Sequence, residues 1–247
     1  MADIYFAKVP LRNAYLRVCN RIGRGDAFSD FMRRYDIDLV LDVGANKGQY
    51  GRQLIRSGFR GRIVSFEPLP SALEKLQMNR WGFGHWKVEP FALGAENTTA
   101  TLNVSANSQS SSLQPMLPAH VAAAPNAAYI SACEVEVRRL DDLFDQYCLP
   151  GDKCYMKLDV QGHEHRVIAG AVESLDRITA IQMELSIEPL YDGAQTWQDA
   201  IESMHQLGYK LMLLTPGFRD QTTGEMMQAD GVFVRYEAVE ELRTAHR

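Results

Sequence analysis

The chain lacks several features that mark particular classes of protein. None of its four cysteines stands in C-x-x-C spacing, and scattered cysteines favour reduced thiols in a cytoplasmic protein. No stretch approaches the roughly 18 apolar residues of a membrane span. Lys8, Arg12 and Arg17 interrupt the apolar residues near the start, so the apolar core of a signal peptide is missing. We therefore expect a cytoplasmic location and no integral membrane span.

An excess of positive charge is also missing. Lys and Arg number 26 against 31 Asp and Glu, and the net charge of −5 does not favour a broad nucleic-acid-binding face. The 247 residues, 46% hydrophobic and 23% charged, are ordinary for a soluble globular protein with one substantial core. We predict an N-terminal helical cap at residues 1–36, amphipathic and locally basic, and one α/β domain at residues 37–247. The oligomeric state stays open.

Apolar runs alternate with helical patterns along the main domain, which favours a parallel sheet with helices on both faces. Two apolar strands at 209–214 and 231–236 predict a terminal antiparallel pair. A long segment at 105–132, rich in Ser, Ala, Asn and Pro, is expected to be irregular and either functional or disordered. The other predicted strands are 39–43, 62–67, 86–92, 99–104, 133–138, 153–158 and 178–185; the helices are 48–57, 70–80, 140–147, 164–173 and 196–207, before a fraying tail at 237–247.

The most informative segment is DVGANKG at residues 42–48, which follows the first strand. A strand that breaks into a glycine turn and opens a helix is typical of a nucleotide-binding half-unit. Gly44 lets the backbone turn sharply, and Gly48 lets a helix start close to a ligand, where its N–H groups favour a carboxylate or phosphate. Asn46 replaces the second glycine of the dinucleotide fingerprint, which disfavours a pyrophosphate. S-adenosylmethionine, with an adenosine and a small carboxylate, fits better.

The second strand ends in Glu67-Pro68, where an acid is placed to accept hydrogen bonds from a ribose diol. The third predicted strand ends at Ala92, beside the same edge of the sheet. The predicted cofactor-binding residues are Asp42, Gly44, Asn46, Gly48, Glu67, Pro68, Ala92 and Asp159.

Three motifs in this order resemble the FkbM-type methyltransferases of the class I, S-adenosylmethionine-dependent fold. They are DVGANKG at 42–48, SFEP at 65–68 and KLDVQGHE at 157–164, and the resemblance runs from about Asp38 to about Arg235. It implies a Rossmann-like, mostly parallel seven-stranded sheet with helices on both faces and an antiparallel last strand. It also implies an O-methyltransferase whose acceptor is a small molecule or glycan, most often a sugar hydroxyl of a glycolipid, polysaccharide or other glycoconjugate.

The third motif contains the first candidates for catalysis. Asp159 lies at a strand end and is expected to hold the methionine amino group of the cofactor or to act as a base. Lys157, two residues earlier, points to the same side of the strand and is expected to keep Asp159 ionised or to contact the acceptor; a structural salt bridge is the alternative. Glu184 ends another strand, where the family places an acid, and is a further candidate base. Many family members carry Glu where this chain has Gln161, so no carboxylate role is assigned there.

His163 and His165 flank Glu164, a grouping that suggests a metal site. Positions i and i+2 of a helix face different sides, however, unlike the i, i+4 pair of a zinc helix. We therefore predict no metal. His163, at the helix start beside the presumed site, is a candidate general base. Glu164 can act simply as a partner of the helix dipole, but the resemblance covers this residue and implies that it supports the site residues around it.

The segment 107–112 is dense in small polar residues. Composition alone favours a solvated linker. The resemblance places the equivalent segment at the active-site face, so Asn107, Ser110 and Ser111 are expected to contact the acceptor or cofactor.

Other functions compete with sugar O-methylation. The acceptor hydroxyl can instead belong to a polyketide or another secondary metabolite. N-methylation of nucleic acid or protein is disfavoured, because KLDV at 157–160 lacks the D/N-P-P-Y/F arrangement. Outside the enzyme class, a non-catalytic cofactor-binding module remains, and an NAD-dependent oxidoreductase is a further rival that Asn46 disfavours.

Overall fold

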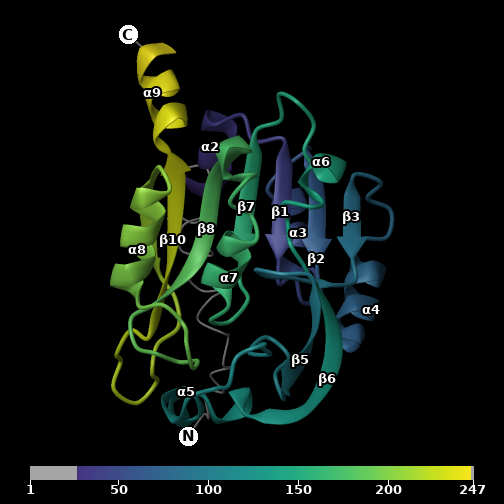
Figure 1. Cartoon of the computed structure of the whole chain (residues 1–247), viewed down its shortest axis with the longest axis vertical. Helices are drawn as coiled ribbons and strands as arrows, with labels where there is room; N and C mark the ends of the chain where they lie inside the picture. Colours follow the sequence, from purple (N-terminus) through teal and green to yellow (C-terminus); the bar gives the residue numbers. More distant parts are fainter. Residues whose placement is uncertain (1–26, 246–247) are drawn as a thin grey trace, which may run out of the picture.

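A seven-stranded sheet forms the centre of this computed structural model, which describes residues 27–245 (Figure 1). Within those residues the strand order is β3-β2-β1-β7-β8-β10-β9, and β10 runs antiparallel to both of its neighbours. The predicted α/β fold, mostly parallel with an antiparallel last strand, is confirmed. The strands are β1 (Leu39–Val43), β2 (Arg62–Phe66), β3 (Trp86–Glu89), β7 (Cys154–Leu158), β8 (Ile178–Ser186), β9 (Tyr209–Pro216) and β10 (Gln228–Arg235).

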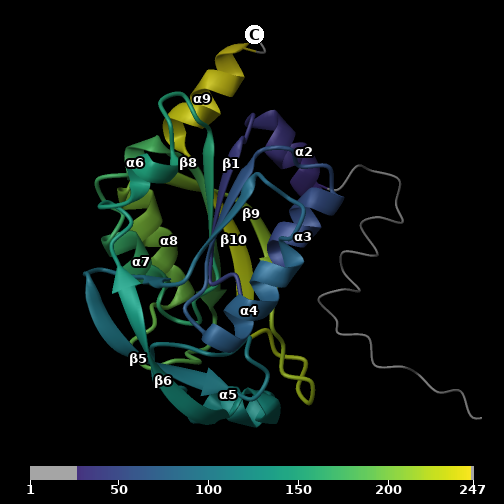
Figure 2. The same cartoon turned by 90° about the vertical axis from the view of Figure 1, so that its right-hand side faces the viewer.

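Helices cover both faces of this sheet, as Figure 2 shows. Every residue of β1 and of β7 is buried, which explains why these strands are apolar apart from Asp42 and Lys157. Leu39 and Leu41 pack into the core of one face and Val40 into that of the other, because successive side chains of a strand alternate. One layer holds α2 (Ala27–Arg34), α3 (Gln49–Arg56) and α4 (Pro70–Asn79), and the other holds α6 (Phe144–Tyr147), α7 (Glu164–Ala169) and α8 (Trp197–Gln206).

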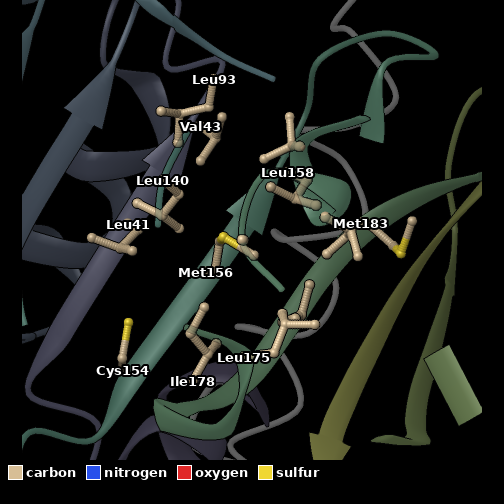
Figure 3. Packing of buried hydrophobic residues seen from close by; sticks show 14 of the residues in the cluster. Leu41, Val43, Leu93, Leu140, Cys154, Met156, Leu158, Leu175, Ile178 and Met183 are labelled. Atoms are coloured by element: carbon tan, nitrogen blue, oxygen red, sulfur yellow. The ribbon is translucent and has the colours of Figure 1, made fainter. Parts of the chain in front are cut away.

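The larger of the two cores lies on the face that α6, α7 and α8 cover (Figure 3). Its centre is formed by side chains of adjacent parallel strands, including Leu41, Met156 and Met183. This packing holds the ends of β1, β7 and β8 in fixed register, with Val43 opposite Leu158. The residues that follow those strands therefore start from a rigid base.

A smaller sheet lies beyond the carboxyl ends of the large one (Figure 1). It pairs β4 (Ala92–Leu93), β6 (Tyr129–Arg138) and β5 (Thr98–Ser105) in that order. The prediction of one strand over 86–92 was wrong: β3 ends at Glu89, and Pro90, which has no N–H to donate, separates it from β4. Ala92 therefore pairs with Val137 in the smaller sheet.

Several other predicted boundaries differ from the structure. The segment 105–132 is not irregular throughout, because it contains α5 (Pro118–Ala123), the 3-10 turn η1 (Pro125–Ala127) and the start of β6. Helices α6 and α7 are shorter than predicted, and the predicted tail forms α9 (Tyr236–Ala245). Val239 of α9 is buried, so packing holds this helix to the sheet.

Of the predicted N-terminal cap, residues 1–26 lie outside the described residues. The part that is described, α2, packs on the sheet through buried Phe31 and Met32. The Phe31 ring lies edge-on to Tyr155 of β7, with ring centroids 6.0 Å apart. The division of the chain at residue 36 stays a prediction.

Helix α3 approaches β3 so closely that a side chain does not fit at Gly51. A Cβ atom there would lie 2.3 Å from the buried Trp86 ring. We expect Gly51→Ala to lower the free energy of unfolding by about 1–3 kcal/mol through overpacking, although alanine favours a helix over glycine by about 1 kcal/mol. Urea denaturation measures the change.

Gly84→Ala is the matched control, because a Cβ atom at Gly84 would meet no atom within 4 Å. This variant should unfold within about 0.5 kcal/mol of the unchanged chain. A Gly51→Ala protein as stable as its Gly84→Ala counterpart would contradict the close packing of α3 on Trp86.

Candidate active site

The predicted site residues converge at the carboxyl ends of the parallel strands. β1 and β7 are neighbours at the point where the strand order reverses, which is where open α/β sheets bind ligands. The turn after β1, Glu67 after β2 and Asp159 after β7 all lie at this edge.

The turn after β1 is held against both neighbouring strands. The N–H groups of Gly44 and Ala45 donate to the carbonyl oxygen of Phe66, each at 3.1 Å. Gly44 has φ +75°, and a Cβ atom there would lie 2.0 Å from the carbonyl oxygen of Asp159. Only glycine satisfies both the left-handed backbone and this close approach.

Glu67 is fixed at the end of β2 by backbone donors. Its Oε2 accepts the N–H of Asn46 at 2.6 Å, and its Oε1 accepts the N–H of Leu69 at 2.8 Å. The side chain is buried, and this burial raises the pKa of Glu67 to about 7 despite the two hydrogen bonds. Pro68, the next residue, is half-buried at the same edge.

A buried ammonium joins two carboxylates beneath the turn. Lys157 Nζ lies 3.3 Å from Asp42 Oδ1 and 3.2 Å from Asp159 Oδ2. Asp42 is completely buried and also accepts the Ser65 hydroxyl at 3.1 Å. Burial raises the pKa of Asp42, and the charge of Lys157 opposes that rise. Asp42 thus holds Lys157 in place, while the Asp159 side chain keeps 17% of its surface exposed.

A second link joins Asp159 to Glu184. The Gln161 side-chain nitrogen donates to Asp159 Oδ1 at 2.9 Å and to Glu184 Oε2 at 2.7 Å. Glu184 Oε2 also lies 3.4 Å from the side-chain nitrogen of Gln228, a second amide donor. The Tyr191 hydroxyl donates to Gln161 Oε1 at 2.7 Å. Sequence reasoning missed Gln161, Tyr191 and Gln228 as site residues; only Gln161, inside the third motif, carried a local signal.

His163 and Glu164 face other groups. The Gln114 amide nitrogen lies 3.0 Å from His163 Nδ1, so with Gln114 as donor the ring proton sits on Nε2. Burial lowers the pKa of His163 to about 4, which keeps the ring neutral. Glu164 Oε1 accepts the N–H groups of Val160 and Gly162 at 3.2 and 3.3 Å and so caps its own turn. Burial raises the pKa of Glu164 to about 7.

The structure brings the polar segment 107–112 onto this site. Asn46 Nδ2 donates to the Ser108 carbonyl at 2.9 Å, and the Ser112 hydroxyl donates to the Gln161 carbonyl at 2.7 Å. Asn107 Oδ1 accepts the N–H of Ser110, and Ser111 Oγ accepts the N–H of Ser105. Asn107 Nδ2 also donates to Ser110 Oγ at 3.1 Å, so all three side chains predicted to bind substrate make hydrogen bonds within the loop that carries them.

Residues 27–245 contain no group of three or more His, Cys, Asp or Glu side chains arranged to hold a metal ion. The rings of His163 and His165 lie 6.4 Å apart. In the same part of the chain, no helix combines the length and the apolar character needed to cross a membrane.

The strand order, the glycine turn after β1 and the acid after β2 define a class I methyltransferase. The sequence model of the methyltransferase FkbM domain matches residues 42–211, and the chain belongs to this family. Members of the family use S-adenosylmethionine as the methyl donor, the cofactor that the motifs predicted.

A curated relative is 2-O-methyltransferase NoeI of Sinorhizobium fredii strain NGR234, which is 28% identical over 163 residues. The match covers 63% of this chain and 66% of the relative, so the chain spans just under two thirds of that protein.

Solved structures with a similar course of the chain are also methyltransferases. Magnesium protoporphyrin IX methyltransferase (ChlM) from Synechocystis PCC 6803, with bound SAM, is 11% identical with a TM-score of 0.48, over 95% of this chain and 86% of that one. An rRNA methylase from Streptococcus thermophilus is 12% identical with a TM-score of 0.45, over 85% and 95% of the two chains. The assignment of the fold rests on the strand order rather than on these likenesses.

Glu164 should make stability depend on pH. Its pKa rises from 4.5 to about 7 on folding, so its contribution is fully present below about pH 4.5 and is lost as the pH rises through about 7. Glu164→Gln keeps an oxygen for the two N–H groups and removes this titration. We expect the variant to gain stability relative to the unchanged chain, by up to about 3 kcal/mol, between pH 5 and 8.

Urea denaturation across this pH range measures the free energy of unfolding of the variant and of the unchanged chain. The buried neutral histidines contribute in the opposite direction but equally to both proteins, so the difference between the two removes their contribution. Glu202→Gln, on the solvent side of α8, is the control. A stability difference between Glu164→Gln and the unchanged chain that stays constant with pH would contradict the raised pKa.

Proposed function

We propose that this methyltransferase transfers the methyl group of S-adenosylmethionine to a hydroxyl group, with a sugar hydroxyl of a glycolipid, polysaccharide or other glycoconjugate as the acceptor. Membership of the FkbM family and the name of the relative NoeI, a 2-O-methyltransferase, support O-methylation. The observation that carries the proposal is the pair of carboxylates, Asp159 and Glu184, linked by Gln161 at the carboxyl ends of β7 and β8.

The strand-end residues fit this cofactor. Each oxygen of Glu67 accepts one backbone N–H and retains a second lone pair, so the carboxylate can also accept both hydroxyls of a ribose. The Asn46 side-chain amide donates to the Ser108 carbonyl. In a dinucleotide-binding loop a glycine at this position leaves room for the pyrophosphate. Asp159, partly exposed and paired with Lys157, offers an anionic partner for the methionine amino group. When bound, S-adenosylmethionine supplies an electrophilic methyl group on a sulfonium.

We assign the general base to Glu184 rather than to Asp159. An adjacent ammonium stabilises the charged form of a carboxylate, so Lys157 makes Asp159 the weaker base. Glu184 accepts hydrogen bonds from the amides of Gln161 and Gln228 at the end of the strand next to β7. In this assignment Glu184 takes the proton of the acceptor hydroxyl. His163 is neutral and its Nδ1 accepts a hydrogen bond from the Gln114 amide. In this assignment His163 positions Gln114, which follows the polar segment 107–112.

Calorimetric titration tests the cofactor site without knowledge of the acceptor. The protein should bind S-adenosylhomocysteine with micromolar affinity and NAD much more weakly. Glu67→Ala should weaken the binding of S-adenosylhomocysteine about tenfold or more, because hydrogen bonds to a charged group contribute about 1.5–3 kcal/mol. Preference for NAD, or an unchanged affinity in Glu67→Ala, would remove the basis for the proposed site.

Transfer of labelled methyl from S-adenosylmethionine to a panel of glycans tests the catalytic roles. Glu184→Gln should lower kcat by about 100-fold or more while the affinity for S-adenosylhomocysteine stays the same, since general base catalysis contributes at least this much. Asp159→Asn should abolish transfer and weaken cofactor binding. Normal turnover in either variant would show that the role of that residue is assigned wrongly. Methylation of polyketides but of no glycan would contradict the proposal of a sugar acceptor.

A further inference from the structure

The Gln161 amide occupies the space between two carboxylates that come from different strands. Its single nitrogen donates one hydrogen to Asp159 and the other to Glu184, at 2.9 and 2.7 Å. Both hydrogens of the amide are therefore used to hold like charges next to each other. Without a donor or a cation between them, two carboxylates at this separation repel, and one of them takes up a proton.

The amide can point in only one direction. In the opposite orientation its oxygen would face both carboxylates at these same short distances, an arrangement without a hydrogen between the oxygens. The buried Tyr191 hydroxyl donates to the amide oxygen at 2.7 Å and reinforces the observed orientation. The network thus sets which atoms of Gln161 face the site.

The backbone at Gln161 is held in a conformation that glutamine rarely adopts. Its φ is +57°, a left-handed value that is unfavourable for a residue other than glycine. Contacts from three directions maintain it: the Ser112 hydroxyl on the Gln161 carbonyl, Tyr191 on the side chain, and Glu164 on the N–H groups of Val160 and Gly162. Such strain persists only where the surroundings over-determine it, and it concentrates at functional sites.

We propose that Gln161 is a positioning residue whose amide bridges Asp159, on the cofactor side, and Glu184, on the acceptor side. The amide takes the place that a bound cation could take and fixes the distance between the two carboxylates. The inference rests on the proposed roles of these two carboxylates. This role gives a reason for a neutral side chain at position 161 of the third motif, because a carboxylate there would stand beside Asp159 and Glu184 as a third acid. The alternative is that Gln161 only fills space between β7 and β8.

Calorimetry with S-adenosylhomocysteine separates a charge-related role from packing. Gln161→Met keeps the length of the side chain and the strained backbone but removes both donors. We expect affinity to fall about tenfold, because Glu184 then repels Asp159. Glu184→Gln alone should bind within twofold of the unchanged chain, and the double variant Gln161→Met with Glu184→Gln should recover to within threefold. An unchanged affinity in Gln161→Met, or no recovery in the double variant, would overturn the proposal.

Titration with Mn²⁺, followed by its electron paramagnetic resonance signal, tests the geometry without the cofactor. Gln161→Glu places a third carboxylate at the position of the amide, and hard cations bind clusters of carboxylate oxygens. We expect this variant to bind Mn²⁺ at least tenfold more tightly than the unchanged chain, and to lose that gain when Glu184→Gln is added. Equal Mn²⁺ binding by Gln161→Glu and the unchanged chain would show that the amide does not occupy a bridging position.

The results of these two tests distinguish a failure of the positioning role from a failure of the proposed function. If the unchanged chain does not bind S-adenosylhomocysteine, the proposed cofactor site is wrong, and the Mn²⁺ titration alone decides the role of Gln161. If the cofactor product binds and Gln161→Met has no effect, the site stands and the positioning role falls.

Discussion

The site depends first on the buried ammonium of Lys157. It lies between Asp42 on β1 and Asp159 after β7, and it also lies 3.5 Å from the carbonyl oxygen of Gly44. An ion pair without water gains stability only where every charge is compensated, and removing one partner leaves an uncompensated charge in the core. Lys157 therefore joins the glycine turn, the central strands and the partly exposed Asp159 in one arrangement. The other strand-end groups take their positions relative to it.

The smaller sheet and the segment between its strands β5 and β6 lie next to this edge. Ser108 receives the Asn46 amide, Ser112 donates to Gln161, and Gln114 meets His163, so one segment contacts the residues after both β1 and β7. The Tyr129 hydroxyl of β6 donates to the Gln114 carbonyl at 2.7 Å and ties the segment to the smaller sheet. These contacts join residues that follow two strands of the large sheet to a segment that lies outside that sheet.

Much of the fold followed from local patterns. The mainly apolar segments at β1 and β7 predicted buried parallel strands, and the glycine turn with Glu67 predicted the edge at which the candidate site lies. The break at Pro90 was visible in the sequence, but the apolar Phe91 and Leu93 suggested that the strand continued. Both residues are apolar because they pack into the larger core, although Leu93 belongs to the smaller sheet, and no pattern within a strand distinguishes one apolar environment from another.

The sequence by itself determined the class of fold, the glycine turn and the acids after the strands, because the alternating strand and helix patterns and the three motifs can be identified from the order of the residues alone. Only the tertiary structure decided which groups those acids contact. Lys157 is shared by Asp42 and Asp159, and Gln161 is shared by Asp159, Glu184 and Tyr191, which join residues from separate strands and loops. Ionisation and hydrogen bonding depend on distances of a few ångströms between such groups, and packing of the strands sets those distances.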